Sequence, residues 1–208
     1  MPNRGPFRHA PAALADKGGA TGTVSPGKLI LVVGPSGAGK DTLIDAARAH
    51  FAGEPGMLFC ERCITRMDQT GEPHAALSEA EFARVAKAGG FFLAWQAHGL
   101  SYGVTAEIVD ILGSGTTVVV NTSRRIIADA RRKWPGTHVV HVTAAPEVLR
   151  ERLKLRGRET SAAVDHRLRR GIEVGCPQGE WVVEVDNSGA LADGVARFNA
   201  ALAALISA

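Results

Sequence analysis

A glycine-rich segment directly behind an apolar run constrains the fold of this chain more than any other feature. Residues 28–33 are mostly apolar and β-branched, and the next segment reads Gly34-Pro35-Ser36-Gly37-Ala38-Gly39-Lys40-Asp41-Thr42. Gly34, Gly39 and Lys40 fit the G-x-x-x-x-G-K pattern of a phosphate-binding loop, whose backbone N–H groups point inward between a strand and a helix. We therefore predict a strand over residues 28–33 and a nucleoside triphosphate site over residues 34–42. A helix over residues 41–51 should turn its positive N-terminal end toward the phosphates.

One residue of the loop departs from the pattern. Asp41 stands where a Ser or Thr hydroxyl normally contacts Mg²⁺. The loop therefore predicts nucleotide binding in which the metal contact is altered. The alternative is a glycine-rich turn that binds nothing, and it leaves the strand, the spacing and the lysine unexplained.

Charge is concentrated in one segment of an otherwise nearly neutral chain. The net charge is only +3, yet residues 150–170 carry eight basic and three acidic side chains, so the rest of the chain is net negative. This distribution favours a local polyanion, such as a group of phosphates, over a nucleic-acid surface. A solvated helix face is the alternative interpretation of such a charge run.

The remaining composition indicates one soluble globular domain in a reducing compartment. The chain has 208 residues, of which 45% are hydrophobic and 22% charged, and no apolar stretch is long enough to span a bilayer. Residues 1–27 are rich in Pro, Gly and Ala, and we expect a disordered tail there. Cys60 and Cys63 form a C-x-x-C pair without the second pair that a zinc site requires. We expect reduced, buried thiols and a cytoplasmic location.

Alternating patterns of strand and helix predict the fold class. Strand-like runs recur at residues 28–33, 57–65, 116–120, 137–143 and 181–186. A capping box at Ser78 and Glu81 starts one helix, and helical patterns cover residues 105–112, 123–133, 146–155 and 191–206. Such alternation is typical of a doubly wound α/β fold with a mainly parallel five-stranded sheet and helices on both faces. Residues 28–208 then form one domain.

Four later segments link this fold to a family of proteins. They read Arg62-Cys63-Ile64-Thr65-Arg66, Leu77-Ser78-Glu79-Ala80-Glu81-Phe82, Gly90-Phe91-Phe92-Leu93-Ala94-Trp95-Gln96-Ala97-His98-Gly99-Leu100-Ser101-Tyr102-Gly103 and Arg152-Leu153-Lys154-Leu155-Arg156-Gly157-Arg158-Glu159. In this order and spacing, the chain resembles the guanylate-kinase-like branch of P-loop kinases over roughly residues 28–187. The resemblance implies a small acceptor-binding subdomain at about residues 57–104 and an arginine-rich lid at about residues 150–170.

The resemblance also implies roles for individual residues. Lys40 would bridge the β- and γ-phosphates of ATP. Arg62 and Arg66 would clamp the phosphate of the acceptor, which suits the bidentate geometry of guanidinium groups, and Tyr102 would contact the acceptor. The residues implied in the lid and its closure over ATP are Arg152, Arg156, Arg158 and Arg167.

Two departures narrow the resemblance. Guanylate kinases carry a base-reading Glu where this chain has Ala94, and an Asp where it has Asn121. The phosphate clamp is retained, so the acceptor should be a phosphorylated molecule other than a guanine nucleotide. Together with the Gly-Lys-Asp loop and the segment from Trp95 to Gly103, these departures resemble the ribose 1,5-bisphosphate phosphokinases, which make 5-phosphoribosyl 1-pyrophosphate in phosphonate breakdown.

If this resemblance holds, ATP phosphorylates the 1-phosphate of ribose 1,5-bisphosphate, and an already anionic nucleophile requires no general base. With Asn121 neutral, Asp41 is the candidate carboxylate for Mg²⁺, with Thr42 as the nearby hydroxyl. Asp41 alternatively serves only the helix N-terminus electrostatically. The residues expected near the sugar and its phosphates are Gln96, His98, Tyr102, Asn121 and Arg124. For His98, packing beside Trp95 is the alternative.

Two other functions remain open at this point. The first is a guanylate-type nucleoside monophosphate kinase, which the loss of both carboxylates argues against. The second is a catalytically silent guanylate-kinase-like interaction module. Such modules tend to lose the phosphate loop, whereas Gly39, Lys40 and the lid arginines are retained here.

Overall fold

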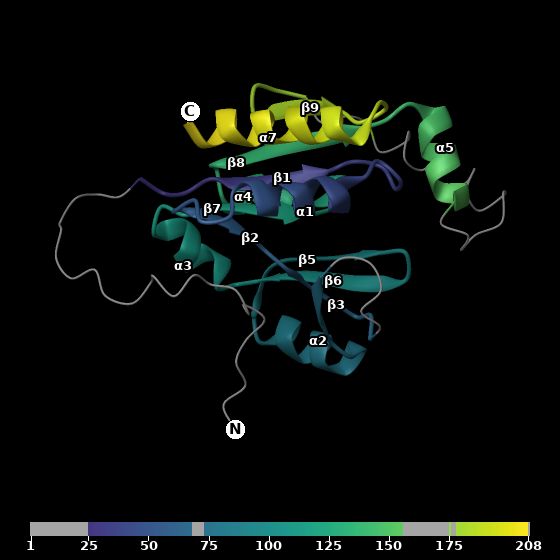
Figure 1. The fold of residues 1–208 in the computed structure, drawn as a ribbon. Helices are drawn as coiled ribbons and strands as arrows, with labels where there is room; N and C mark the ends of the chain where they lie inside the picture. Colours follow the sequence, from purple (N-terminus) through teal and green to yellow (C-terminus); the bar gives the residue numbers. More distant parts are fainter. Residues whose placement is uncertain (1–24, 68–72, 156–174, 176–177, 208) are drawn as a thin grey trace. The chain divides into compact units, whose positions relative to one another are not determined.

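The strands of the computed structural model form two sheets (Figure 1). The model describes residues 25–67, 73–155, 175 and 178–207. The first sheet has five strands in the order β2-β7-β1-β8-β9, and the second has four in the order β4-β3-β6-β5. The strands are β1 (Leu29–Val33), β2 (Met57–Phe59), β3 (Arg62–Ile64), β4 (His74–Ala76), β5 (Phe91–Ala97), β6 (Leu100–Thr105), β7 (Thr117–Asn121), β8 (Thr137–Thr143) and β9 (Val182–Asp186).

The helices follow the predicted patterns closely. They are α1 (Lys40–His50), α2 (Glu79–Lys87), α3 (Ile108–Gly113), the 3₁₀ helix η1 (Arg124–Ile126), α4 (Ile127–Lys133), α5 (Pro146–Leu155) and α7 (Leu191–Ser207). The predicted capping box is confirmed, because the Ser78 side chain accepts from the Glu81 N–H while the Glu81 carboxylate accepts from the Ser78 N–H. Within the described ranges, no helix combines the length and the apolar content needed to cross a membrane.

The five-stranded sheet confirms the predicted α/β class. Strand β2 pairs with β7 in parallel, as β8 does with β9. Every residue of β1 and of β7 is buried, which explains their continuous apolar sequences, since strands covered on both faces need no polar alternation.

One predicted strand is two strands in the structure. Residues 57–65 were expected to form a single run, but β2 belongs to the five-stranded sheet and β3 to the four-stranded sheet. The Cys60 N–H still donates to the Val119 carbonyl at 2.8 Å, whereas Cys63 lies opposite Gly103 of β6. The chain therefore changes sheets at Glu61, which the uniform strand-like composition of the run did not reveal.

Within the described ranges, the chain divides into two compact units, one holding residues 25–29 and 56–120 and the other residues 30–55 and 121–207. In the first unit, α2 packs on the four-stranded sheet, where the rings of Phe82 and Phe91 stack with centroids 4.5 Å apart. Strands β5 and β6 are joined by a two-residue turn at His98 and Gly99, with φ angles of 52° and 74°. Positive φ at both positions is the geometry that tight hairpins prefer.

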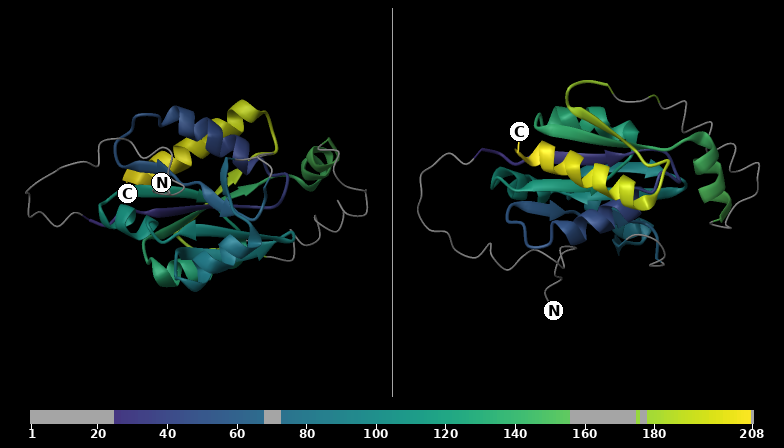
Figure 2. Two further views of the ribbon diagram at one scale, coloured as in Figure 1. Left: turned by 90° about the horizontal axis from the view of Figure 1, so that it is seen from below. Right: turned by 45° about the horizontal axis from the view of Figure 1, so that its top comes forward.

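In the second unit, helices α1 and α7 lie side by side, as both views of Figure 2 show. Leu43 on α1 and Phe198 and Leu202 on α7 are all fully buried. Burial of each such side chain contributes about 1.5–3 kcal/mol. This packing fixes the start of α1, which follows the phosphate loop.

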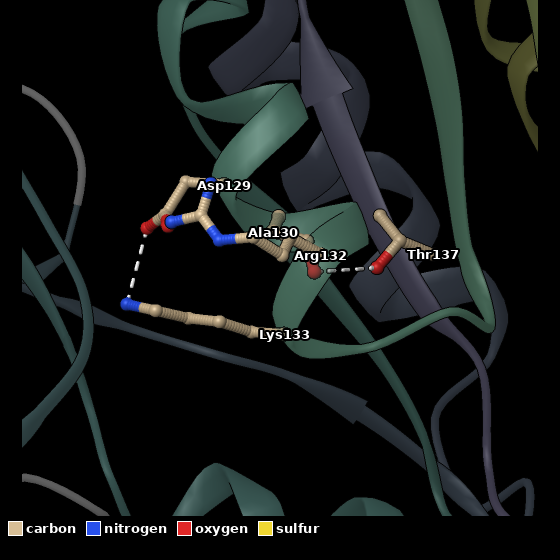
Figure 3. A network of polar contacts seen from close by, with 5 residues as sticks. All are labelled: Asp129, Ala130, Arg132, Lys133 and Thr137. Atoms are coloured by element: carbon tan, nitrogen blue, oxygen red, sulfur yellow. Dashed lines mark hydrogen bonds and ion pairs between the residues drawn. The ribbon is translucent and has the colours of Figure 1, made fainter.

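The end of α4 carries a small polar network (Figure 3). The Asp129 carboxylate pairs with Arg132 and, at 3.1 Å, with Lys133. The Thr137 hydroxyl donates to the Ala130 carbonyl at 3.4 Å. The Thr137 hydroxyl bonds to a carbonyl in the last turn of the helix, and this bond is buried. The two ion pairs are partly exposed, so each contributes little to stability. Their role is structural.

Candidate active site

The phosphate loop has the backbone that its glycines predict. Gly34 has a φ of 150°, and a Cβ atom there would lie 2.1 Å from the Val142 carbonyl oxygen. Gly39 has a φ of 88° and forms the N-cap of α1, and its Cβ atom would lie 2.5 Å from the side-chain nitrogen of Asn187. At both positions only glycine satisfies the conformation and the close approach.

Lys40 lies at the mouth of this loop. Its ammonium donates to the carbonyl oxygens of Gly34 and Pro35, both at 3.0 Å. In the described part of the chain, no side chain caps the N-terminus of α1, so the first N–H groups of the helix point at the loop. A lysine ammonium and a helix N-terminus in one place form an anion site. The predicted sequence of strand, loop and helix is confirmed, with the helix starting at Lys40.

Asn187 supports the phosphate loop through a hydrogen bond to its backbone. The sequence did not identify Asn187 as a site residue. It follows β9, is only 1% exposed, and donates through its side-chain nitrogen to the Ala38 carbonyl at 2.8 Å. The one signal in the sequence is its position at the end of a strand, because the carboxyl ends of parallel strands meet at one edge of a sheet.

The two residues at which the metal site was expected to differ are hydrogen-bonded to each other. Asn121, the last residue of β7, donates through its side-chain nitrogen to the Asp41 carboxylate at 2.6 Å. Asp41 lies in the first turn of α1, and Thr42 beside it is exposed. Among the described residues there is no group of three or more His, Cys, Asp or Glu side chains around one point. A single carboxylate suits Mg²⁺, which takes most of its oxygens from phosphates and waters.

One arginine of this unit, Arg152, lies beside the phosphate loop. A guanidinium nitrogen of Arg152 on α5 is buried, has no hydrogen-bond partner among the described residues, and lies 3.8 Å from the position of a Cβ atom on Gly39. A buried guanidinium nitrogen without a hydrogen-bond partner is costly unless an anion joins it, so this arrangement fits a phosphate. Arg124 on η1 donates to the Gly175 carbonyl at 3.4 Å. The predicted residues Arg156, Arg158 and Arg167 lie outside the described residues.

The pKa of His141 is affected by positive charges near the phosphate loop. It lies on β8, is 4% exposed, and its Nδ1 is 3.7 Å from the Glu184 carboxylate. Burial lowers the pKa of His141, the cations Arg124 and Lys40 lower it further, and Glu184 opposes them. The imidazole is therefore neutral at neutral pH. Arg124 and Lys40 are the positive charges near it, and they favour the binding of an anion in this region.

The predicted acceptor residues divide between the two faces of the four-stranded sheet. Arg62 is 8% exposed, and its guanidinium carbon lies 5.1 Å from the ring centroid of Tyr102 and 5.9 Å from that of Trp95. Alternation along β5 turns Ala94 and Gln96 to the opposite face, and both are exposed. The structure thus brings Arg62 and Tyr102 together and separates Gln96 from them.

The other predicted acceptor residues lie at the ends of strands. Arg66 follows β3, and its carbonyl oxygen is 3.2 Å from the Nε2 atom of His74, which is buried. His98 is exposed at the β5–β6 turn, rather than packed in a core. His98 therefore lies at the end of the hairpin, two residues after Gln96 in the sequence.

The two thiols of the C-x-x-C pair are buried, as expected. Cys60 and Cys63 are free and buried. Burial is the main cause that raises the pKa of Cys60 to about 12 and that of Cys63 to about 11. Neither thiol ionises at neutral pH in the folded chain, so neither is poised to act as a nucleophile. The third cysteine, Cys176, lies outside the described residues.

The fold and the loop define the chain as a guanylate-kinase-like P-loop kinase. The guanylate kinase of Anaplasma phagocytophilum shares the fold with a TM-score of 0.59 and 17% identity, over 86% of each chain. A gluconokinase of Sinorhizobium meliloti 1021 matches with a TM-score of 0.51 and 26% identity, over 88% of this chain and 95% of the other. No protein-family model matches the sequence.

Within this class, the chain belongs to the ribose 1,5-bisphosphate phosphokinase family. The ribose 1,5-bisphosphate phosphokinase PhnN of Brucella melitensis biotype 2 is 47% identical over 165 residues, covering 78% of this chain and 85% of that protein. The protein of the same name from Acidiphilium cryptum is 52% identical over 144 residues, covering 69% and 77%.

Proposed function

We propose that this protein transfers the γ-phosphoryl group of ATP to the 1-phosphate of ribose 1,5-bisphosphate, giving 5-phosphoribosyl 1-pyrophosphate in phosphonate breakdown. Membership of the family supports the reaction, because relatives bear its name. The observation that carries the choice of acceptor is the exposed Ala94 on β5, which leaves no carboxylate there to read a guanine base. The intact loop at Gly39 and Lys40 argues against a silent interaction module.

The chemistry requires alignment and charge neutralisation. A terminal oxygen of the acceptor's 1-phosphate attacks the γ-phosphorus, the bond to the β,γ-bridging oxygen breaks, and ADP leaves with its electron pair. The attacking oxygen is already anionic, so no general base is needed. Two anions must approach each other, and Lys40, the first N–H groups of α1 and the buried nitrogen of Arg152 supply the opposing charge.

Bound Mg²⁺ would add further charge neutralisation at the triphosphate. Asp41 and Thr42 are the proposed ligands, and Asp41 has the stronger support because it is fixed by a neighbouring strand. The hard oxygens of a carboxylate and a hydroxyl suit this ion.

The acceptor-binding residues of this proposal follow from the family resemblance, and Gln96 lies on the other face of the four-stranded sheet from Arg62 and Tyr102. Guanidinium groups bind the sugar phosphates, and the polar side chains of the exposed sheet face and the hairpin turn bind the ribose. The proposed residues are Arg62, Arg66, Gln96, His98, Tyr102, Asn121 and Arg124, together with Arg156 and Arg167 of the proposed lid. The free thiols of Cys60 and Cys63 suit a reducing cytoplasm.

An ADP-release assay with ribose 1,5-bisphosphate, GMP or no acceptor tests the proposal. We expect turnover with the sugar bisphosphate only, and its loss in Lys40→Ala. Lys87→Ala is the matched control, because Lys87 is an exposed lysine at the end of α2. Phosphorylation of GMP at a comparable or higher rate would establish a nucleotide kinase instead, and no turnover with either acceptor would favour the interaction module.

A further inference from the structure

We propose that Asn121 is a positioning residue that holds the Asp41 carboxylate in the metal site. The carboxylate then comes from the phosphate loop, and β7 supplies the neutral side chain. In most P-loop enzymes the loop supplies a hydroxyl and a neighbouring strand supplies a carboxylate to Mg²⁺. Here the loop supplies the carboxylate and β7 supplies an amide. This inference rests on the proposed function for the identity of the ion and its nucleotide.

The hydrogen bond between Asn121 and Asp41 fixes the position of the Asp41 carboxylate. Asn121 and Asp41 are 80 residues apart in sequence, and their side chains meet at 2.6 Å. An amide nitrogen can only donate, so one carboxylate oxygen accepts and the orientation of the group is set. The distance is at the short end for a bond to a charged acceptor. Asn121 is 9% exposed at the end of a fully buried strand, which makes it a rigid support.

The metal site keeps one carboxylate even though this carboxylate comes from the loop and not from the strand. One carboxylate and one neutral hydrogen-bonding group still lie at the junction of loop and strand, so the site keeps a single negative charge for the ion. The next carboxylate along the helix, Asp45, is exposed and pairs with Arg48 at 3.5 Å. It is therefore engaged elsewhere, and Asp41 is the carboxylate of α1 that contacts β7.

A purely structural contact is the alternative, and it makes different predictions. If Asn121 merely ties α1 to β7, its loss lowers the melting temperature but leaves metal affinity unchanged. If it positions Asp41, its loss weakens metal binding in molecules that remain folded. Groups that orient metal ligands typically affect metal affinity by roughly 10- to 100-fold.

The test measures Mn²⁺ binding to the protein–ADP complex by electron paramagnetic resonance, without any acceptor. We expect Asn121→Ala and Asp41→Asn each to weaken Mn²⁺ binding by roughly 10-fold or more. The double variant Asp41→Asn with Asn121→Asp restores one carboxylate facing one amide, so it should regain most of the affinity. Asp45→Asn, one turn along the same helix, should bind as the wild type does.

Each outcome bears on the proposal. Unchanged Mn²⁺ affinity in folded Asn121→Ala, or an exchanged variant no better than Asp41→Asn, would overturn it. Circular dichroism and melting temperature without metal identify variants that do not fold. In that case Asn121→Ser, which keeps a donor but shortens its reach, replaces the alanine variant and should weaken binding. The Mn²⁺ test contains no acceptor, so a negative result does not affect the assignment of ribose 1,5-bisphosphate as the acceptor. Likewise, a negative result in the ADP-release assay does not affect the conclusion about Asn121 and Asp41.

Discussion

Two glycines of the second unit allow the support of the phosphate loop to be measured. Gly39 and Gly53 have the same φ of 88°, so an alanine suffers the same backbone strain at either position. A Cβ atom on Gly39 would lie 2.5 Å from the side-chain nitrogen of Asn187, whereas one on Gly53 would have nothing within 4 Å. The difference between Gly39→Ala and Gly53→Ala therefore isolates the contact with Asn187.

The structure sets the expected magnitudes. Left-handed backbone costs a non-glycine residue about 1–2 kcal/mol, which is the whole penalty expected for Gly53→Ala. At Gly39 the new methyl group also displaces Asn187 from the Ala38 carbonyl, which it contacts at 2.8 Å. Loss of a partner by a buried polar group costs about 1–3 kcal/mol. We therefore expect Gly39→Ala to lose about 2–5 kcal/mol of unfolding free energy in total.

Urea unfolding of the nucleotide-free protein checks these values, with Asn187→Ala completing a double-mutant cycle. In the Asn187→Ala background the clash is absent, so Gly39→Ala should cost only the strain, and the coupling energy should be about 1–3 kcal/mol. Weaker ADP binding should accompany Gly39→Ala but not Gly53→Ala. Equal penalties at the two glycines, or no coupling with Asn187, would refute the assignment of Asn187 as the support of the loop.

Three further predictions concern buried polar groups. Gly194→Ala should destabilise the protein by about 1 kcal/mol or more in urea unfolding despite the better helix propensity of alanine, because its Cβ atom would lie 2.1 Å from the Asn187 side-chain oxygen. The pKa of His141 is lowered from 6.5 in the folded state, so the unfolded chain takes up its proton first as pH falls. Stability should therefore be lost as the pH falls below about 6.5, and His141→Gln should reduce this loss in melting experiments. Cys60 and Cys63, with pKa values of about 12 and 11, should resist alkylation at pH 8 until urea unfolds the chain.

Matched variants make these predictions decisive. His50→Gln removes an exposed histidine at the end of α1 and should leave the pH dependence of melting as in the wild type. Alkylation is followed in a Cys176→Ser background, so that the signal reports only the two buried thiols. A stabilised Gly194→Ala, a pH profile indifferent to His141, or rapid alkylation of the folded protein would each contradict the corresponding argument.

Most of the fold could be predicted because its signals are local. The apolar strand before Gly34, the capping box at Ser78 and the start of α5 at Pro146 each depend on a few neighbouring residues. The five strands of the first sheet follow from this kind of pattern, and so does the phosphate loop. Within the run of residues 57–65, the pattern did not reveal the change of sheets at Glu61, since β2 and β3 have the same strand-like composition.

The second sheet was harder to predict from the sequence. The sequence of the β5–β6 hairpin indicates a family motif but does not predict two strands. In the structure, the turn at His98 and Gly99 has the positive φ angles of a tight hairpin. Asn-Gly is the usual signal at such a turn, and His-Gly is a weaker one. Register then places Trp95 and Gln96 on opposite faces. A list of binding residues taken from one motif therefore mixes the two sides of a sheet.

The supports of the site could not be predicted because each joins distant parts of the sequence. Asn121 and Asn187 are neutral amides at strand ends, and nothing near them in sequence names Asp41 or Ala38 as their partners. Their importance arises only when parallel strands bring their carboxyl ends to one edge. Local sequence therefore identified the groups expected to contact the nucleotide, whereas the groups that hold them in place required the sheet.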